Sequence, residues 1–256
     1  MKLFGQHVGG MYLWTIFLLT ALVVIASYTS RVLPIGVAAA VLFGSVIETI
    51  AKKYFLNQKP SIPFSGIITG LIIGSIVPPE ASILLIFLAS LIGVISKLFL
   101  KFKGSNIFNP AALGLITSLF LFRVGDEWWV ASNYNVFGVA ITLTPILIIL
   151  AYKAKRLPLA LSFAIVSIAL SFVISGAAAS AGALIASIFS VNYYFAFVML
   201  IEPKTSPNNK SIQVLYGILL SLLYAALALS EIMYPILISL LLGNLGYLVY
   251  RKYRRR

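Results

Sequence analysis

One acidic residue, Glu48, lies within an apolar stretch of the sequence, in the run Ser45-Val-Ile-Glu-Thr-Ile-Ala-Lys-Lys53. A carboxylate inside a membrane-spanning segment is costly, and by default it indicates an ion or proton path. The alternative is an interfacial role, in which Glu48 pairs with Lys52 one helical turn away and extends toward the inner membrane surface. Glu48 is predicted to be an ion-pathway residue.

Two polar turns provide further candidates for that pathway. Asn109 precedes Pro110 in Asn106-Ile-Phe-Asn-Pro-Ala-Ala-Leu-Gly114. Its amide could cap the start of a helix, or the helix N-terminus could bind an anion. Glu202 lies in Ile201-Glu-Pro-Lys-Thr-Ser-Pro-Asn-Asn209, a turn that could equally be a plain cytoplasmic loop. We add Asn109 and Glu202 to the predicted ion pathway and leave these alternatives open.

Three aromatic residues, Trp128, Trp129 and Tyr134, gather near the outer end of an apolar segment. This placement is typical of the aromatic belt at a membrane interface. Stacking on a flavin is the alternative.

The rest of the composition excludes several kinds of chemistry. The chain has no cysteine, and its single histidine is His7. Disulfides, iron–sulfur clusters, thiolate metal sites and paired-histidine haem ligation are therefore excluded. The sequence also contains no phosphate-binding glycine loop and no nucleophile–base pair. We expect no metal site and no catalytic residue, so any redox cofactor must be organic.

Apolar segments of membrane-spanning length position these residues. The 256-residue chain is 61% hydrophobic with a mean hydropathy of +1.05, outside the range of soluble domains. A helix crosses the hydrocarbon core in about 20 apolar residues, which predicts an all-α integral membrane protein of about ten transmembrane helices. The predicted segments are Met11–Tyr28, Leu33–Ile50, Ile62–Val77, Ala81–Leu98, Ile107–Phe122, Val136–Tyr152, Leu157–Ile174, Gly182–Ile201, Ile212–Leu229 and Ile232–Tyr250.

Basic residues set the predicted orientation, because cytoplasmic loops collect lysine and arginine. With the N-terminus inside, every basic residue except Arg31 and Arg123 falls in an inner loop or at a terminus. We therefore place both termini in the cytoplasm, keep the first segment as a retained span, and predict a multi-pass protein of the cell membrane. The net charge of +13 is explained by this topology and by the lipid bilayer, so no nucleic-acid partner is expected.

Residues 1–256 are predicted to form a single transmembrane domain. Ten helices could divide into two inverted five-helix repeats, at residues 1–123 and 136–256. The third and fifth segments are short and carry glycine or Asn-Pro punctuation. Short helices of this kind usually line a cavity, since lipid cannot satisfy their free backbone groups. We expect the Ser65–Pro79 segment and the Asn109-Pro110 helix start to face one shared cavity.

Several of these motifs, in this order, resemble the NqrB/RnfD family. They are Glu48 with the basic stretch and Gln58-Lys59-Pro60 after it, Ser65-Gly-Ile-Ile-Thr-Gly-Leu-Ile-Ile-Gly-Ser-Ile-Val-Pro-Pro79, Gly104-Ser-Asn-Ile-Phe-Asn-Pro-Ala-Ala-Leu-Gly114 and Glu202-Pro-Lys-Thr-Ser-Pro207. The resemblance covers roughly Leu33 to Leu229. It implies a urea-channel-like fold of two inverted repeats in a large membrane subunit of a sodium-pumping or Rnf-type redox complex.

The resemblance also raises the question of a flavin. Family members usually carry FMN esterified to a threonine of an outer Ser-Gly-Ala-Thr type motif, and this chain has no such motif. Ester-linked FMN is therefore not expected, and any FMN or riboflavin that the chain binds should be held noncovalently. The residues that we assign to such a flavin are Ser65, Thr69, Asn109, Trp128 and Tyr134.

The leading hypothesis is a shortened membrane subunit of an Rnf/Nqr-like ion-translocating complex, rather than a catalytic chain by itself. Its expected partners are the other membrane and peripheral subunits of that complex. The alternatives are a stand-alone channel or transporter for a small solute or vitamin on the same scaffold, and a structural scaffold for partner subunits.

Overall fold

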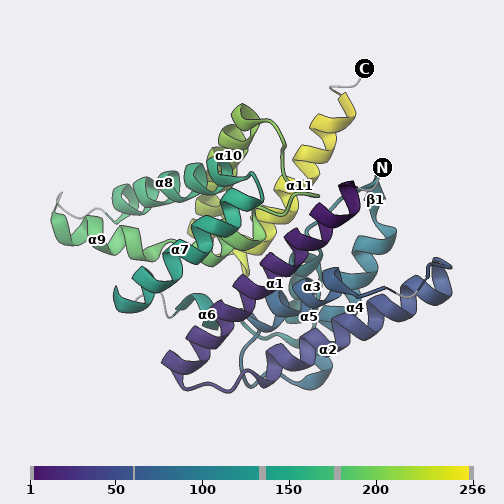
Figure 1. Cartoon of the computed structure of the whole chain (residues 1–256). Coiled ribbons are helices and arrows are strands. Elements are labelled where there is room, and N and C mark those ends of the chain that lie inside the picture. Colours follow the sequence, from purple (N-terminus) through teal and green to yellow (C-terminus); the bar gives the residue numbers. More distant parts are fainter. Residues whose placement is uncertain (1–2, 60, 133–136, 176–179, 254–256) are drawn as a thin grey trace. The chain divides into compact units, whose positions relative to one another are not determined.

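The computed structural model describes residues 3–59, 61–132, 137–175 and 180–253, most of which are helical. The chain divides into two compact units, Met1–Asn133 (unit 1) and Tyr134–Arg256 (unit 2), which are described here one at a time (Figure 1).

Unit 1 is built from helices and one very short hairpin. Its elements are α1 (Leu3–Ser30), α2 (Ile35–Ile50) with its π-helical continuation η1 (Ala51–Phe55), α3 (Phe64–Gly74), α4 (Ile83–Phe99), β1 (Lys101–Phe102), β2 (Ser105–Asn106), α5 (Pro110–Phe122) and α6 (Trp129–Ser132). The antiparallel strands β1 and β2 have two residues each, and they join α4 to α5.

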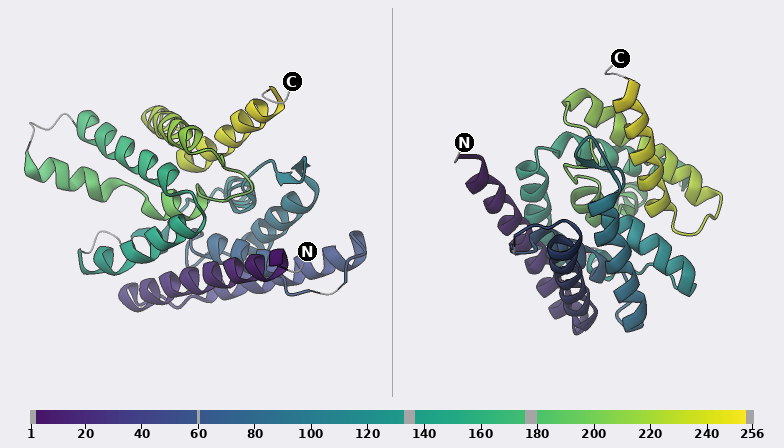
Figure 2. Two further views of the ribbon diagram at one scale, coloured as in Figure 1. Left: turned by 45° about the horizontal axis from the view of Figure 1, so that its top comes forward. Right: turned by 90° about the vertical axis from the view of Figure 1, so that its right-hand side faces the viewer.

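The described residues of unit 2 form helices and no strand. These are α7 (Phe137–Lys153), α8 (Leu157–Ile174), α9 (Ala181–Ser190), the π-helix η3 (Phe195–Met199), α10 (Lys210–Leu229) and α11 (Pro235–Tyr253). Figure 2 shows this unit in two further views. The helix α8 packs against α10, and α10 packs against α11.

Among the described residues, four helices are long and apolar enough to cross a membrane. They are Gly10–Ser30, Ile35–Phe55, Leu157–Ile174 and Lys210–Leu229. Such helices, with shorter apolar ones beside them, are typical of an α-helical membrane protein. Each predicted apolar segment contains a helix, but the number of spans and their orientation stay predictions.

The predicted segment Gly182–Ile201 is wrong as one continuous helix. The structure ends α9 at Ser190 and begins η3 at Phe195. At the break, the Asn192 side chain accepts a hydrogen bond from the backbone N–H of Phe195, with 2.8 Å between Oδ1 and N. An asparagine that bonds the backbone in this way starts a new turn rather than continuing the old helix.

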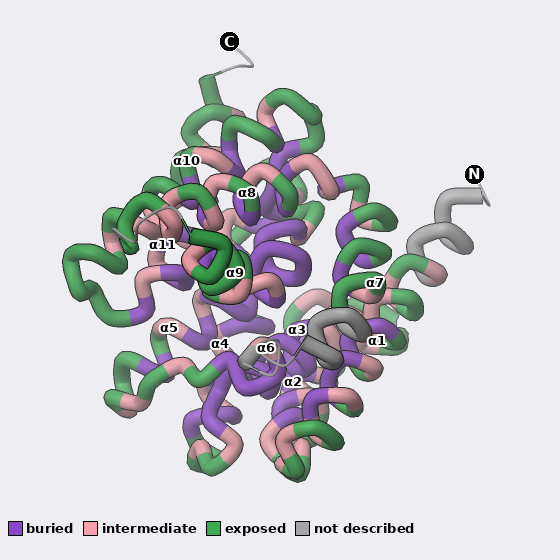
Figure 3. Tube along the Cα trace, turned by 90° about the vertical axis from the view of Figure 1, so that its left-hand side faces the viewer, coloured by how far each residue is buried: buried purple, intermediate pink, exposed green. Residues whose placement is uncertain are grey.

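In unit 1, α2 packs closely against α3, and the two helices run antiparallel. Gly66, Gly70 and Gly74 recur every fourth residue on α3 and lie against the backbone of α2. A Cβ atom added to Gly70 would lie 2.4 Å from the carbonyl oxygen of Ala40. We read these glycines as helix breaks in the sequence, whereas in the structure they allow close packing, as in small-xxx-small motifs. The resulting burial of α3 is visible in Figure 3.

Candidate functional site: a buried ion pair in unit 1

Glu48 lies on the buried face of α2, near the end of that helix. Its side chain is 2% exposed, and its Oε1 atom is 2.6 Å from the Nζ atom of Lys52. The predicted i,i+4 pair is therefore confirmed. The carboxylate does not reach the surface of the unit, as the interfacial alternative would have it, because it points inward and has a second partner there.

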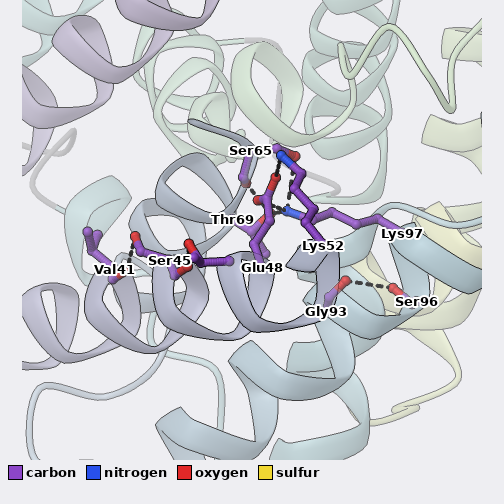
Figure 4. Close-up of polar contacts among 10 residues, drawn as sticks. Val41, Ser45, Glu48, Lys52, Ser65, Thr69, Gly93, Ser96 and Lys97 are labelled. Carbon is purple, nitrogen blue, oxygen red and sulfur yellow. Dashed lines mark hydrogen bonds and ion pairs between the residues drawn. The ribbon is translucent and has the colours of Figure 1, made fainter. Parts of the chain in front are cut away.

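That second partner is Lys97, in the last turn of α4. Its Nζ atom lies 3.0 Å from Glu48 Oε2 and its side chain is 6% exposed. Nζ also donates to Ser65 Oγ at 3.0 Å and to Thr69 Oγ1 at 3.5 Å. Figure 4 shows the lysine reaching toward the three side chains from its own helix. The site thus combines residues of α2, α3 and α4.

The charge pattern groups Lys97 with the cytoplasmic-loop lysines, and that prediction is wrong. The residue belongs to α4 and is buried. A buried ammonium needs a counter-charge and hydrogen-bond acceptors, since removing an ion from water costs several kcal/mol. Glu48, Ser65 and Thr69 supply both.

Glycine packing brings the carboxylate to the hydroxyl groups. A Cβ atom on Gly66 would lie 2.3 Å from the carbonyl oxygen of Gly44 and 2.9 Å from Glu48 Oε2. Only glycine therefore lets α3 approach Glu48 this closely. On the next helix, Gly93 lies between the Thr69 side chain and the carbonyl oxygen of Pro110, which lie 3.3 and 2.9 Å from the position of an added Cβ. The start of α5 is therefore adjacent to the same cluster.

Asn109 caps α5, as one of the two sequence interpretations predicts. Its Oδ1 atom accepts a hydrogen bond from the Ala112 N–H at 3.0 Å, and the residue is 2% exposed. Neither α5's first residues nor the Ser65–Pro79 segment is exposed along its length. A shared cavity, an anion at this N-terminus and the pathway role of Asn109 stay predictions.

The chain after α5 satisfies the carbonyl groups at the end of the short helix α3. The Trp129 indole N–H donates to the Gly74 carbonyl at 2.8 Å. The backbone N–H groups of Glu127 and Trp128 donate to the Ile76 carbonyl at 3.0 and 3.2 Å. Protein N–H groups therefore donate the hydrogen bonds to these carbonyl groups, in place of the water or ligand of a cavity.

This arrangement also overturns the expected aromatic belt for Trp128 and Trp129. Both residues are buried, at 9% and 6% exposure, and the Trp128 indole donates to Asp126 at 2.6 Å. A belt requires rings at the lipid interface. Tyr134, the third member, lies outside the described residues.

Of the five residues assigned to a flavin, Tyr134 lies outside the described residues, and the other four do not all lie at one place. Ser65 and Thr69 contact Lys97. The backbone N–H of Trp128 instead donates to the Ile76 carbonyl, just past the other end of α3 and about 10 Å away along the helix. Asn109 is engaged as a cap. We therefore derive no reaction step from a flavin in this unit.

Glu202 belongs to unit 2, where it lies at the start of a tightly bonded turn. Its Oε2 atom accepts from Thr205 Oγ1 at 3.1 Å, and its carbonyl oxygen accepts from Ser206 Oγ at 2.7 Å. Thr205 and Ser206 are both 3% exposed. The turn is therefore not a plain exposed loop.

Arg156, which the sequence interpretation counted only as a loop charge, organises this turn. It is 4% exposed. Its Nε atom donates to Ser206 Oγ at 2.9 Å, and the guanidinium also bonds the Asn208 side chain and the Pro203 carbonyl. Burial lowers the pKa of the guanidinium, and Tyr247 opposes that shift. Arginine nevertheless stays charged in proteins.

We expect Arg156→Gln to loosen the 202–208 turn. Hydrogen bonds to a charged group contribute roughly 1.5–3 kcal/mol, so the open population should rise about tenfold or more. Trypsin cleavage after the exposed Lys204 reports this opening. Lys155→Gln removes an exposed charge next to Arg156 and is the matched control. Equal cleavage rates in the two variants would contradict the role of Arg156.

Comparison with known proteins places the ion-pair site within a recognised sequence family. A model of the "NQR2, RnfD, RnfE family" matches residues 5–145, more than half of the chain. This range contains Glu48, Ser65, Thr69, Lys97 and Asn109. The Glu202 turn lies outside it.

Two curated relatives have a similar sequence over part of their length. A subunit of the ion-translocating oxidoreductase complex of Actinobacillus succinogenes is 33% identical over 131 residues, which is 49% of this chain and 36% of the relative. A subunit of the proton-translocating ferredoxin:NAD(+) oxidoreductase complex of Clostridium ljungdahlii is 26% identical over 115 residues, 43% of this chain and 35% of the relative. The match thus spans about a third of each relative. With the family model covering the ion-pair site and most of unit 1, this chain belongs to the NQR2, RnfD and RnfE family.

Proposed function

We propose that this chain is an RnfD/NqrB-like membrane subunit of an ion-translocating electron transport complex, and that a cation passes through unit 1 by way of Glu48. The observation that carries the proposal is the buried Glu48–Lys97 pair, which lies within the family-matched residues. The names of both relatives describe subunits of ion- or proton-translocating complexes.

Burying the Glu48–Lys97 pair costs free energy. The attraction between a buried carboxylate and a buried ammonium often fails to offset the free energy of removing both from water. Apolar residues of similar size at the same positions often give the fold equal stability. Intramembrane charges are accordingly rare and usually mark ion pathways. The glycine contacts that seat Glu48 against α3 leave no room for side chains at Gly66. A structural anchor alone would not need this arrangement.

The topology is part of the proposal. We propose ten spans with both termini in the cytoplasm, in two inverted repeats of five. In each unit, the second predicted segment packs against the fourth and the fourth against the fifth, as α2, α4 and α5 in unit 1 and α8, α10 and α11 in unit 2. The basic residues of the predicted inner loops support the orientation.

Partners and ion flux test the function. A tagged chain purified from its native membrane in mild detergent should bring redox subunits with it. Liposomes that contain the chain alone should show no cation or solute flux, because a subunit of a redox-driven pump lacks its driving reaction. Rapid solute flux through the isolated chain, with no copurifying redox subunit, would favour the stand-alone transporter instead.

A flavin prediction accompanies the proposed function. Any FMN or riboflavin that copurifies should be released on denaturation, because the outer connection Val124–Asn135 contains no threonine for an ester bond. Denaturing electrophoresis with in-gel fluorescence, followed by intact mass measurement, tests this. A fluorescent band with the mass of the chain plus FMN would contradict it, whereas riboflavin or FMN in the denatured supernatant would support it.

A further inference from the structure

The ammonium group of Lys97 in unit 1 has three oxygen atoms of described residues among its partners. They are a carboxylate oxygen of Glu48, from α2, and the hydroxyl oxygens of Ser65 and Thr69, from α3 (Figure 4). Their distances to Nζ are 3.0, 3.0 and 3.5 Å. Carboxylate and hydroxyl oxygens are the ligands that hard cations take in proteins.

The Thr69 hydroxyl is oriented for this role. It donates its single proton to the backbone carbonyl of Ser65, with 2.9 Å between the oxygens. A hydroxyl group has one donor and two acceptor lone pairs. With its proton committed to the helix backbone, Thr69 offers only lone pairs toward Lys97, as a cation ligand must.

The two oxygens of Glu48 have different surroundings. Oε1 faces Lys52, whose side chain is 23% exposed, and Oε2 faces Lys97, whose side chain is 6% exposed. Each oxygen thus holds one ammonium group, one on the accessible side and one inside. An incoming cation can coordinate the inner oxygens only if Lys97 leaves them.

We propose that Lys97 is a tethered cation that occupies a monovalent cation site formed by Glu48, Ser65 and Thr69. Entry of a translocated cation displaces the ammonium, and the ammonium returns when the cation leaves. The carboxylate is then never left buried without a positive partner, which would be costly. This inference rests on the proposed function for its physiological meaning, but the competition itself can be measured on the isolated chain.

The test is cation-dependent thermal stability of the full-length chain in detergent. Li⁺, Na⁺ and K⁺ chlorides are titrated separately at constant ionic strength, balanced with choline chloride. The midpoint is the cation concentration that gives half of the maximal rise in unfolding temperature. A group tethered at a site competes at an effective concentration on the order of millimolar or above, so Lys97→Met should lower the midpoint for at least one cation about tenfold. Lys97→Gln repeats the measurement if the methionine variant does not fold.

Two controls locate the effect. Lys53→Met removes an exposed ammonium from the same turn of η1 and should leave the midpoint near that of the wild type. Adding Thr69→Val to Lys97→Met removes one proposed ligand with little change in shape, and it should abolish the gained response. Wild-type midpoints in both Lys97 variants, or a gain that survives Thr69→Val, would overturn the inference.

The outcomes also separate this inference from the proposed function. A gained cation response in a chain that assembles with no redox partner would support the tethered cation and contradict the subunit role. A complex that translocates cations through Glu48, while Lys97→Met and Lys97→Gln bind cations no better than the wild type, would support the subunit role and overturn the tethered cation.

Discussion

Replacing Glu48 with glutamine should abolish redox-driven cation translocation by the assembled complex. Glutamine keeps the shape of the side chain but removes the charge that compensates a cation in the low-dielectric interior. Losing only about 1.4 kcal/mol of stabilisation for the ion would weaken its binding at Glu48 about tenfold, and an uncompensated charge costs more. Initial rates of cation uptake into membrane vesicles, driven by the electron donor of the complex, measure the effect.

Folding and transport must be separated in that experiment. Glu48→Gln leaves Lys97 buried beside two hydroxyl groups without its carboxylate, and breaking a buried pair in this way costs about 3–5 kcal/mol. The double variant Glu48→Gln/Lys97→Met removes both charges and should recover stability while translocation stays absent. Glu80→Gln, which neutralises an exposed acid of unit 1, is the matched control. Wild-type uptake by Glu48→Gln would refute the pathway role.

The sequence predicted the helices well because apolar length is a local property. Each predicted segment contains a helix, and the Asn109 cap lies where Asn-Pro chemistry places it. The error in segment eight has the same origin. The run Val191–Tyr194 is apolar enough to continue a helix, and only the Asn192 side chain shows that the backbone turns there.

Only one of the two residues in the ion pair could be predicted from the sequence. Glu48 stands out as an acid in an apolar run, but Lys97 follows the rule for cytoplasmic loop charges and was assigned to a loop on that basis. One signal was present in the sequence. Ser90, Gly93 and Lys97 follow at intervals of three and four, on one face of α4, and all three are buried. A lysine in register with small residues indicates a helix contact rather than solvent.

The hydrogen bonds from the chain after α5 to the carbonyl groups at the end of α3 could not be predicted from local sequence patterns. Trp129 and Gly74 are 55 residues apart in sequence, and their hydrogen bond depends on how α3 and α5 pack. Tryptophan near the end of a membrane segment is usually interfacial. Only the tertiary structure shows that this indole instead satisfies a carbonyl at the end of a short helix.

Gly70→Val should unfold unit 1 or severely destabilise it. The nearest atoms to an added Cβ are the carbonyl oxygen and carbon of Ala40 and the Cα of Val41, at 2.4 to 2.6 Å. All three belong to the α2 backbone, so no rotamer change can relieve the clash and the helices must separate. Overpacking costs about 1–3 kcal/mol even where side chains can adjust, and a domain has only about 5–15 kcal/mol of stability.

Separation of α2 from α3 would also draw Glu48 away from Ser65 and Thr69, so cation translocation should be lost together with stability. Thermal unfolding in detergent measures the first effect. Gly246→Ala on α11 is the control, because nothing lies within 4 Å of its added Cβ. That substitution should raise stability by up to about 1 kcal/mol through helix propensity. Gly70→Val should therefore lower the free energy of unfolding, whereas Gly246→Ala should raise it. A Gly70→Val variant as stable as the wild type would show that α2 and α3 do not pack at this distance.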